Sequence, residues 1–451
     1  MLDFLQIVVS FVVTLGVLIS VHEYGHFWVA RRCGVKVLRF SIGFGKPLLR
    51  WKDKHDTEFV IAGIPFGGYV KMLGEPGSDI SEADKAVSFA HKPVYQRIAI
   101  VAAGPLVNLA FAILLYWAIF MVGVTRIAPV VGEVEPGSLA AQAGIQSGDE
   151  IVSVDGDRTL SWDNVSFALV TRLGETGSIR LGIQPEGSNL STEVDIPVSQ
   201  WMVGREKDGP LEVLGIEQYF PPMPVVIDEV LPNKAADRYG LVKGDEILSA
   251  NGQPLAHWRD WVEVIRDHPG KPIAIEVARG GELLTMTVIP DVVGEGNDQY
   301  GQIGAATLPV KLPDSMIREI QYAPVQAFSE SLGKTWDFIT LTLAAIGKMI
   351  SGQISLDNLS GPVTIAKVAG DSASYGIEPF LNFMAYLSIS LGVLNLLPVP
   401  VLDGGHLMYY AAEMIKGSPV SEKVQAVGNS LGLALLVMFM GLAFYNDIVG
   451  L

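Results

Sequence analysis

Long runs of apolar residues, almost free of charge, dominate the pattern of the chain. They cover roughly residues 4–30, 98–123, 379–402 and 424–445. Each run can cross a bilayer as a helix, because a spanning helix needs about 20 apolar residues. The pattern predicts a multi-pass α-helical membrane protein with four transmembrane helices.

A different pattern follows the first run. Residues 58–72 contain two β-prone stretches around a turn rich in glycine and proline, which predicts a β-hairpin within this segment. The hairpin is very apolar and adjoins a predicted span, so we expect it to be membrane-associated. At membrane depth, the backbone N–H and C=O groups of such a segment need hydrogen-bond partners from the protein or from water in a cavity. An ordinary cytoplasmic hairpin is the alternative.

The polar region between the second and third runs contains an internal repeat. Gly148-Asp149-Glu150-Ile151 recurs 96 residues later as Gly244-Asp245-Glu246-Ile247. The residues that recur at this same offset, without a gap, also include Glu133, Val134, Pro136, Ala140, Gly144, Ser153, Gly156 and Trp162. A fixed period of this kind predicts two successive copies of one β-rich domain.

Residues 315–350 show helical periodicity with scattered charges and are too polar to span. Such a helix either lies along the membrane surface or packs as an ordinary amphipathic helix. The predicted organisation is therefore a membrane part at 1–123, two β-rich domains at 124–221 and 222–310, an amphipathic surface segment at 311–376 and a second membrane part at 377–451.

Composition supports a membrane protein and restricts its partners. Hydrophobic residues make up 49% of the 451 residues, and the mean hydropathy is +0.36. The net charge is −16, and residues 127–376 hold 34 acidic against 17 basic residues, so the rest is nearly neutral. We therefore expect the lipid bilayer, and no nucleic acid, among the partners. Cys33 is the only cysteine, which excludes an intrachain disulfide framework.

Basic residues between the first two runs set the expected orientation. Eight of them are Arg31, Arg32, Lys36, Arg39, Lys46, Arg50, Lys52 and Lys54. By the positive-inside rule this loop is cytoplasmic, which puts the N-terminus and the acidic block outside, in the periplasm of a bacterium. The first run carries Asp3 in place of a basic n-region, so we interpret it as a span and not as a cleavable signal peptide.

The candidate chemistry begins at the end of the first run, with His22-Glu23-Tyr24-Gly25-His26. His22 and His26 are one helical turn apart and can reach the same metal ion, with Glu23 placed to take a proton from bound water. Zinc fits this arrangement because it lowers the pKa of bound water to about 7 and polarises a carbonyl. The motif also arises by chance in soluble helices, but ionisable groups at membrane depth are usually functional.

A third ligand is predicted at the end of the third run. Pro398 and Pro400 cannot continue a helix, so we expect an extended stretch that lines a cavity and leads to Asp403. The first and third runs cross in the same direction, which puts Asp403 at the depth of the two histidines. His406 is the competing candidate. In the second run, Asn108 either forms a helix–helix hydrogen bond or lines the site.

These motifs together resemble those of the site-2 protease family. The resemblance runs from end to end and rests on H-E-Y-G-H at 22–26, F-G-G-Y-V-K-M at 66–72, A-G-P-x-x-N at 103–108, the tandem G-D-E-I repeats and N-x-x-P-x-P-x-L-D-G-G at 395–405. It is closest to a bacterial branch with four spans and two periplasmic PDZ domains.

The resemblance implies roles for individual residues. His22, His26 and Asp403 would hold Zn²⁺, and Glu23 would be the catalytic residue that activates water. The substrate-binding candidates are Asn395, Asn108, Gly67, Gly68, Tyr69, Pro398 and Pro400. The hairpin would guide an unwound substrate strand, and the PDZ pair would act as a size filter. Implied substrates are single-span membrane proteins of the bacterial inner membrane, namely a pre-trimmed anti-sigma factor and signal-peptide remnants, cut near the cytoplasmic side.

Two other functions compete with proteolysis. A membrane peptide-binding scaffold would use the zinc structurally, and a metal transporter would need further ligands along a path. A structural zinc normally has four protein ligands. The sequence offers three and an adjacent glutamate, which leaves an open position and favours an intramembrane zinc protease.

Overall fold

The computed structural model describes residues 2–74, 80–206, 208–221, 223–294, 296, 299–307 and 312–449. Within these ranges, four helices are long and apolar enough to cross a membrane, which confirms the prediction from the apolar runs. They are α1 (Leu2–Arg32), α2 (Val94–Val122), α10 (Ile377–Leu396) and α12 (Glu422–Val449).

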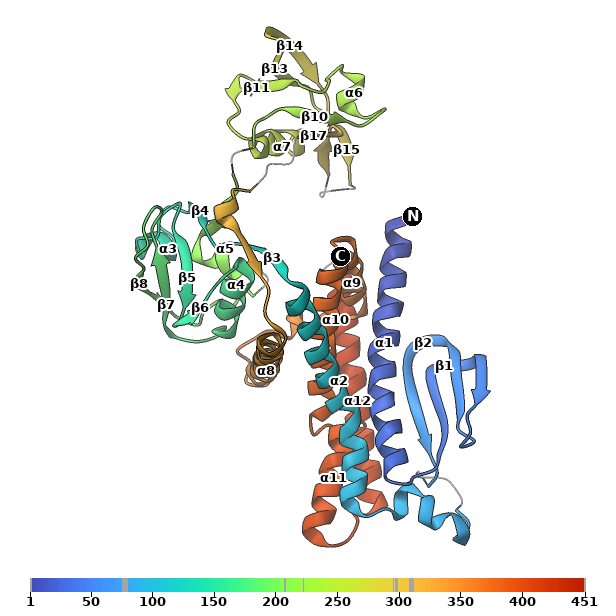
Figure 1. The fold of residues 1–451 in the computed structure, drawn as a ribbon. Coiled ribbons are helices and arrows are strands. Elements are labelled where there is room, and N and C mark those ends of the chain that lie inside the picture. The colour runs from blue at the N-terminus through green and yellow to red at the C-terminus, as the bar shows by residue number, and fades with distance from the viewer. Residues whose placement is uncertain are drawn as a thin grey trace.

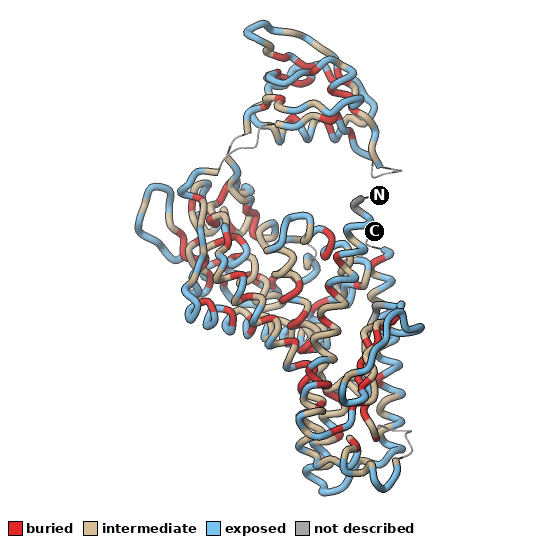
Figure 2. The backbone as a smooth tube through the Cα atoms, turned by 45° about the vertical axis from the view of Figure 1, so that its right-hand side comes forward, coloured by how far each residue is buried: buried red, intermediate tan, exposed pale blue. Residues whose placement is uncertain are grey.

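The four helices run side by side, with the short helix α11 (Asp403–Lys416) completing the bundle at one end (Figure 1). The ends of the chain and the β-rich part of the molecule lie at the opposite end (Figure 1). The two ends of the chain lie at the same end of the bundle because the chain crosses it an even number of times. Much of the spanning helices is exposed (Figure 2), and the exposed residues include many apolar ones, such as Leu431, Leu435 and Phe439 of α12, as expected of surfaces that meet lipid.

The third apolar run is not helical over its whole predicted length. Helix α10 ends at Leu396, before Pro398 and Pro400, which confirms the helix break predicted from these prolines. The physical reason is the pair Pro398 and Pro400, because proline lacks the backbone N–H and disfavours helical backbone in the residue before it. The remaining residues form the connection to α11.

The predicted hairpin within 58–72 is wrong in its pairing. Residues 58–72 form one irregular strand, β2 (Glu58–Met72), which pairs with β1 (Val37–Lys52). The two β-prone stretches of β2 do not pair with each other, because residues 39–42 of β1 lie between them: Phe40 pairs with both Phe59 and Val70. Residues 47–52 pair with the outer side of the first stretch. The segment 68–72 is thus an edge of this sheet.

The internal repeat is visible in the order of the elements. The first β-rich unit contains β4 (Val131–Val134), α3 (Leu139–Gln142), β5 (Glu150–Val154), β6 (Asp157–Arg158), α4 (Trp162–Thr171), β7 (Gly177–Gln184), β8 (Thr192–Val198), α5 (Pro210–Leu214) and β9 (Ile216–Gln218). The second contains β10 (Ile227–Val230), α6 (Ala235–Arg238), β11 (Glu246–Ala250), β12 (Gln253–Pro254), α7 (Trp258–Arg266), β13 (Ile273–Arg279), β14 (Glu282–Val288), β15 (Asp291–Val293), β16 (Tyr300–Gln302) and β17 (Ala305–Thr307).

Both units use the same four-stranded sheet, in the orders β6-β5-β7-β8 and β12-β11-β13-β14. Each closes around its own buried core, with Trp201 in the first and Trp261 in the second among the largest buried side chains. The aspartates of the two G-D-E-I turns also match: Asp149 accepts from the Gln146 N–H, and Asp245 from the Val242 N–H. The domain boundaries predicted at residue 222 and at 310–311 fall on residues outside those described.

A two-stranded ribbon connects this β-rich part to the helices. Strand β3 (Val124–Ile127), directly after α2, pairs with β18 (Ile317–Ile320), directly before α8. Arg126 on β3 forms ion pairs with Glu378 on α10 at 2.6 Å and with Asp163 of the first unit at 3.2 Å. The chain therefore leaves and re-enters the membrane part at adjacent points.

Two further helices, α8 (Pro324–Ile350) and α9 (Pro362–Ser374), pack against the bundle near the end that carries the β-rich units. Helix α8 is seen nearly end-on in Figure 1, where the spanning helices run lengthwise, so it lies across the bundle. It contacts α2 and α10, and its Phe338 ring lies 5.1 Å from Phe167 of the first unit. Its other face exposes Val325, Leu332 and Trp336. Short 3-10 turns occur at Glu82–Val87, Phe89–His91, Asp314–Met316 and Leu356–Asn358.

Candidate metal centre

The centre forms where α1 and α2 come closest. A Cβ atom at Gly25 would lie 2.5 Å from the Ala103 carbonyl oxygen, so only glycine permits this approach. Opposite it, a Cβ atom at Gly104 would lie 2.3 Å from Nε2 of His26 and 2.9 Å from Cε1 of His22. Small residues at both positions thus let the histidines of α1 lie directly against α2.

Three predicted ligands converge there. Nε2 of His22 and Nε2 of His26 are 3.2 Å apart, and they lie 3.1 Å and 3.5 Å from Oδ2 of Asp403. One ligand atom from each of the three residues falls within 4.8 Å of the others, and no other described residues form such a group. His406, the competing candidate, is outside this group, and its ring faces Tyr409.

Asp403 reaches the histidines because the chain turns tightly after α10. It is the first residue of α11. The stretch before it was expected to be extended, but it is folded into turns, with the Val399 N–H donating to Leu397 and the Leu402 N–H to Val399. Val401 has a φ of 86°, which a β-branched residue rarely adopts. The prediction of an extended stretch is wrong because packing closes the chain onto α11 and α12.

The histidines are oriented by groups on α2. Nδ1 of His26 lies 2.9 Å from the Ile100 carbonyl oxygen, which requires the Nδ1 proton and leaves Nε2 free to bind a metal. Nδ1 of His22 lies 3.3 Å from the amide of Asn108, whose Oδ1 atom is buried without a partner among the described residues. A half-turn of the Asn108 amide would let the unpartnered Oδ1 accept the His22 Nδ1–H, which leaves Nε2 of His22 free for a metal. Both Nε2 atoms then face Asp403 without a proton and are available to a metal.

This donor set fits zinc. Two imidazole nitrogens and one carboxylate oxygen are ligands that zinc prefers, and three protein ligands are typical of catalytic sites. The buried Asp403 Oδ2 atom lies 3.1 Å and 3.5 Å from the Nε2 atoms of His22 and His26, as expected of three atoms that can share one metal. The outer contacts to Ile100 and Asn108 are of the kind that fixes the tautomer of metal-binding histidines.

Glu23 lies between this group and the sheet edge. A Cβ atom at Gly68 would come within 3.0 Å of the Glu23 Cγ atom and 2.9 Å of Ile19, so β2 rests directly on α1. The sheet edge at Gly68 therefore lies directly beside the Glu23 side chain.

The other predicted substrate residues lie on several different elements. The Tyr69 ring stacks on Phe44, and its hydroxyl accepts from Arg39. Gly67 has a φ of 123° and leaves room for Phe44. Asn395 lies in the last turn of α10 and makes no side-chain hydrogen bond to a described residue. The turn with Pro398 and Pro400 packs on α12, where a Cβ atom at Gly432 would meet the Pro400 oxygen at 2.1 Å.

Sequence reasoning missed the contacts that hold α11 in place. Arg97 of α2 pairs with Glu413 of α11, and both side chains are largely buried. The Arg97 guanidinium also lies over the Tyr410 ring. A lone arginine just before an apolar run was the available signal, but the partner is 316 residues away. The roles of Gly104 and the Ile100 carbonyl were missed for the same reason.

Comparison with known proteins agrees with this geometry. The sequence profile of Peptidase family M50 matches residues 10–439. The chain belongs to this family. Protease RseP of Yersinia pestis is 46% identical over 449 residues, and Regulator of sigma-E protease RseP of Escherichia coli K12 is 46% identical over 447, each covering 99% of both chains. A relative from Vibrio cholerae, 40% identical over 449 residues, is classed by its name among zinc metalloproteases.

These findings confirm the resemblance seen in the sequence. The protein is a zinc-dependent protease of the site-2 type, and its relatives carry names that place them in sigma-E regulation. The scaffold and transporter interpretations are thereby set aside.

Proposed function

We propose that this protease cuts a peptide bond within or near the transmembrane segment of single-span membrane proteins. The observation that carries the proposal is the convergence of His22, His26 and Asp403 beside Glu23, on helices that are apolar enough to span a membrane. His22, His26 and Asp403 would be the zinc ligands. Zinc bound there would polarise the scissile carbonyl and make bound water acidic.

Glu23 acts as the general base in this proposal. Its carboxylate lies on the same turn of α1 as His22, yet it is outside the group of three ligands. It can accept the proton of the attacking water and pass it to the leaving amine. Asn108 would hold His22 in the required tautomer, and Asn395 would contact the substrate backbone.

The edge of β2 is proposed to bind the substrate as an added strand. Peptide groups in a transmembrane helix are satisfied by their own hydrogen bonds, so the helix must unwind before cleavage. Residues 68–72 offer an edge next to Glu23 that can replace the lost hydrogen bonds. Gly67, Gly68 and Tyr69 would line this strand. The turn with Pro398 and Pro400 packs against α12, so the role of these prolines would be to hold Asp403 in place.

For the substrates we propose a pre-trimmed anti-sigma factor and signal-peptide remnants in a bacterial inner membrane. The basic loop after α1 would face the cytoplasm and the β-rich units the periplasm, with the active site near the cytoplasmic side. Support comes from the names of the relatives, which place those proteins in sigma-E regulation.

We further propose that the two β-rich units are PDZ domains that filter substrates by size. The β3–β18 ribbon and the contact of Phe338 with Phe167 hold the first unit close to the bundle. A substrate with a bulky outer domain would collide with units held in this way. A trimmed substrate would not.

The test of the catalytic assignment is Glu23→Gln. This variant should retain zinc and lose cleavage of a trimmed single-span substrate by about 10²–10⁴-fold, the usual contribution of a general base. Zinc content by elemental analysis and cleavage by gel assay are measured on the same preparation. Loss of zinc in a folded Glu23→Gln protein would contradict the assignment.

A further inference from the structure

The ligand and substrate candidates lie on elements other than α12, so the fourth span has no assigned role. All of α12, Glu422–Val449, is described, and its buried residues are Gly432 and Asp447. Elsewhere the helix exposes apolar side chains such as Leu435 and Phe439, as expected where it meets lipid. The two buried residues therefore mark where α12 is attached to the rest of the protein.

Asp447 attaches α12 to α9, at the end of the bundle that carries the β-rich units (Figure 1). Its carboxylate accepts hydrogen bonds from the Gly361 N–H at 3.0 Å, the Val363 N–H at 2.8 Å and the Thr364 hydroxyl at 2.6 Å. The two N–H groups belong to the start of α9 and have no partner within that helix, so a carboxylate is favoured there. Because α9 packs against α1, this contact fixes the height of α12 in the bundle.

Gly432 attaches α12 to the turn that precedes Asp403. A Cβ atom at Gly432 would lie 2.1 Å from the Pro400 carbonyl oxygen. One helical turn earlier, a Cβ atom at Gly428 would lie 2.2 Å from the hydroxyl oxygen of Tyr409, on α11. Glycine at both positions lets α12 lie directly against the turn and against α11.

The turn itself has little room to relax. The start of α11 packs onto it so closely that a Cβ atom at Gly404 would lie 2.0 Å from the Leu397 oxygen. Val401 has a φ of 86°, and a β-branched residue keeps such a conformation only where its surroundings fix it. Asp403 follows two residues later, so the contacts that fix the turn also fix this carboxylate.

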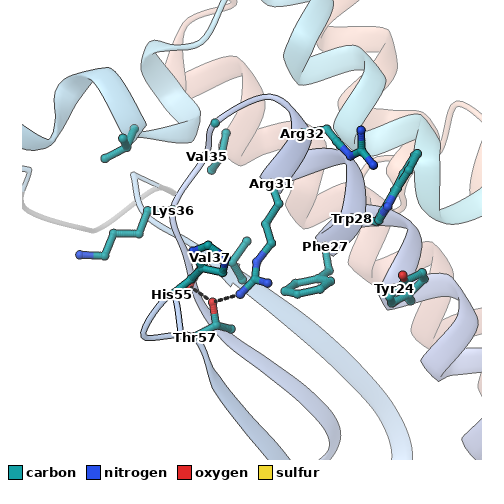
Figure 3. Close-up of a pocket in the computed structure, with 12 residues that line it drawn as sticks. Tyr24, Phe27, Trp28, Arg31, Arg32, Val35, Lys36, Val37, His55 and Thr57 are labelled. Atoms are coloured by element: carbon teal, nitrogen blue, oxygen red, sulfur yellow. Dashed lines mark hydrogen bonds between the residues drawn. The ribbon is translucent and has the colours of Figure 1, made fainter. Parts of the chain in front are cut away.

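The residues that hold the two histidines lie on α1, α2 and the sheet. Helix α1 packs on α2 at Gly25 and Gly104. The end of α1 is tied to the β1–β2 connection, where Arg31 donates to the Thr57 hydroxyl at 2.8 Å (Figure 3). A change on α12 should therefore displace Asp403 relative to the histidines and leave the histidines in place.

We propose that α12 positions the third candidate ligand, with Gly432 and Gly428 holding the Pro400 turn and α11 where Asp403 reaches the histidines. The inference rests on the proposed assignment of Asp403 to zinc. A methyl group at Gly432 would require a shift of about 1 Å, from 2.1 Å to the 3.0 Å that real Cβ contacts need. Because Asp447 anchors α12, part of that shift falls on the turn, whereas a functional site must hold its geometry to within about 0.5 Å.

The first test is Gly432→Ala in the full chain. Zinc affinity, measured by chelator titration, should fall about 10–100-fold, the usual loss when a supporting contact of a metal ligand is removed. The visible spectrum of Co²⁺ bound in place of zinc should also change, because it reports coordination geometry, which a loss of stability alone does not alter. Gly441→Ala is the matched control on α12, since a Cβ atom there would meet nothing within 4 Å. Its zinc affinity and Co²⁺ spectrum should be unchanged.

The second test uses rescue. Gly428→Ala should lower zinc affinity about 10-fold, and adding Tyr409→Phe should restore most of it. The Tyr409 hydroxyl oxygen is the atom that the new methyl group would meet, and the next Tyr409 atom lies 3.4 Å away. This hydroxyl is buried without a partner among the described residues, so its removal should cost little.

Asp403→Ala in the same titration separates this inference from the ligand assignment. Zinc loss in Asp403→Ala, with zinc affinity and Co²⁺ spectrum unchanged in both glycine variants, would overturn the role of α12 and leave the ligand set intact. Retained zinc in Asp403→Ala would overturn both. An equal loss in Gly441→Ala, or a loss in Gly428→Ala that Tyr409→Phe does not restore, would also overturn the role of α12. If Gly432→Ala does not fold, the Gly428 and Tyr409 variants decide the question.

Discussion

At the scale of single residues, Asp403 and His406 are close together at the start of α11, and Asp403 is the one that faces the histidines of α1. Asp403→Ala should therefore lower zinc affinity by more than about 100-fold, since even the loss of an outer partner costs 10–100-fold. His406→Ala should leave zinc content unchanged. Metal analysis after dialysis against graded chelator measures both variants, and the reverse pattern would make His406 the third ligand.

Asn108 distinguishes a positioning role from substrate binding. If its amide fixes the His22 tautomer, Asn108→Leu should lower zinc affinity about 10–100-fold. Asn108→Asp, which keeps an acceptor for the His22 N–H, should retain most of it. The same chelator titration measures both. Normal zinc affinity in Asn108→Leu together with a raised KM would assign Asn108 to the substrate.

At the scale of elements, the contact between β2 and α1 rests on Gly68. A Cβ atom there would lie 2.9 Å from Cγ2 of Ile19 and 3.0 Å from Cγ of Glu23, both on α1, so Gly68→Ala must push the edge strand away from Glu23. Overpacking of this kind costs about 1–3 kcal/mol, and we expect lower cleavage with zinc retained.

Gly63→Ala is the matched control on the same strand. Its Cβ atom would meet its nearest neighbour, the Lys46 oxygen, at 3.8 Å, which is ordinary contact. Cleavage by this variant should match that of the unmodified protein. Equal activity of the Gly68 and Gly63 variants would show that the sheet edge does not position the substrate.

At the scale of the whole molecule, the ribbon of β3 and β18 defines how the β-rich units can be removed. The Ala128 N–H donates to the Met316 oxygen at 2.8 Å. Residues 129–315 can therefore be replaced by an Asn-Gly hairpin turn that keeps the pairing of β3 with β18. If the units exclude bulky substrates, this deletion should keep zinc and the cleavage of a trimmed substrate, and it should gain cleavage of the full-length one.

Both substrates are assayed side by side with the intact and the shortened protein. Continued rejection of the full-length substrate after deletion would rule out a size filter. Reduced cleavage of the trimmed substrate by a zinc-loaded deletion protein would point to docking on the units instead.

The sequence by itself determined the features that depend on local pattern. Length and hydropathy define the spanning helices, since the bilayer imposes both. The spacing of His22 and His26 follows from the helical period, and the offset between the G-D-E-I motifs identifies the repeat. Because the first and third runs cross the membrane in the same direction, the sequence also predicted that Asp403 lies at the depth of the two histidines.

Only the tertiary structure decided the features that depend on partners far apart in sequence. Strand pairing is one: both halves of β2 suit a hairpin, but residues 39–42 lie between them because β1 folds back on itself. The contact of Asn108 with His22 and the pairing of Arg97 with Glu413 are others. Local propensity fixes the type of an element, whereas its neighbours are fixed by packing, and packing joins residues that no local pattern connects.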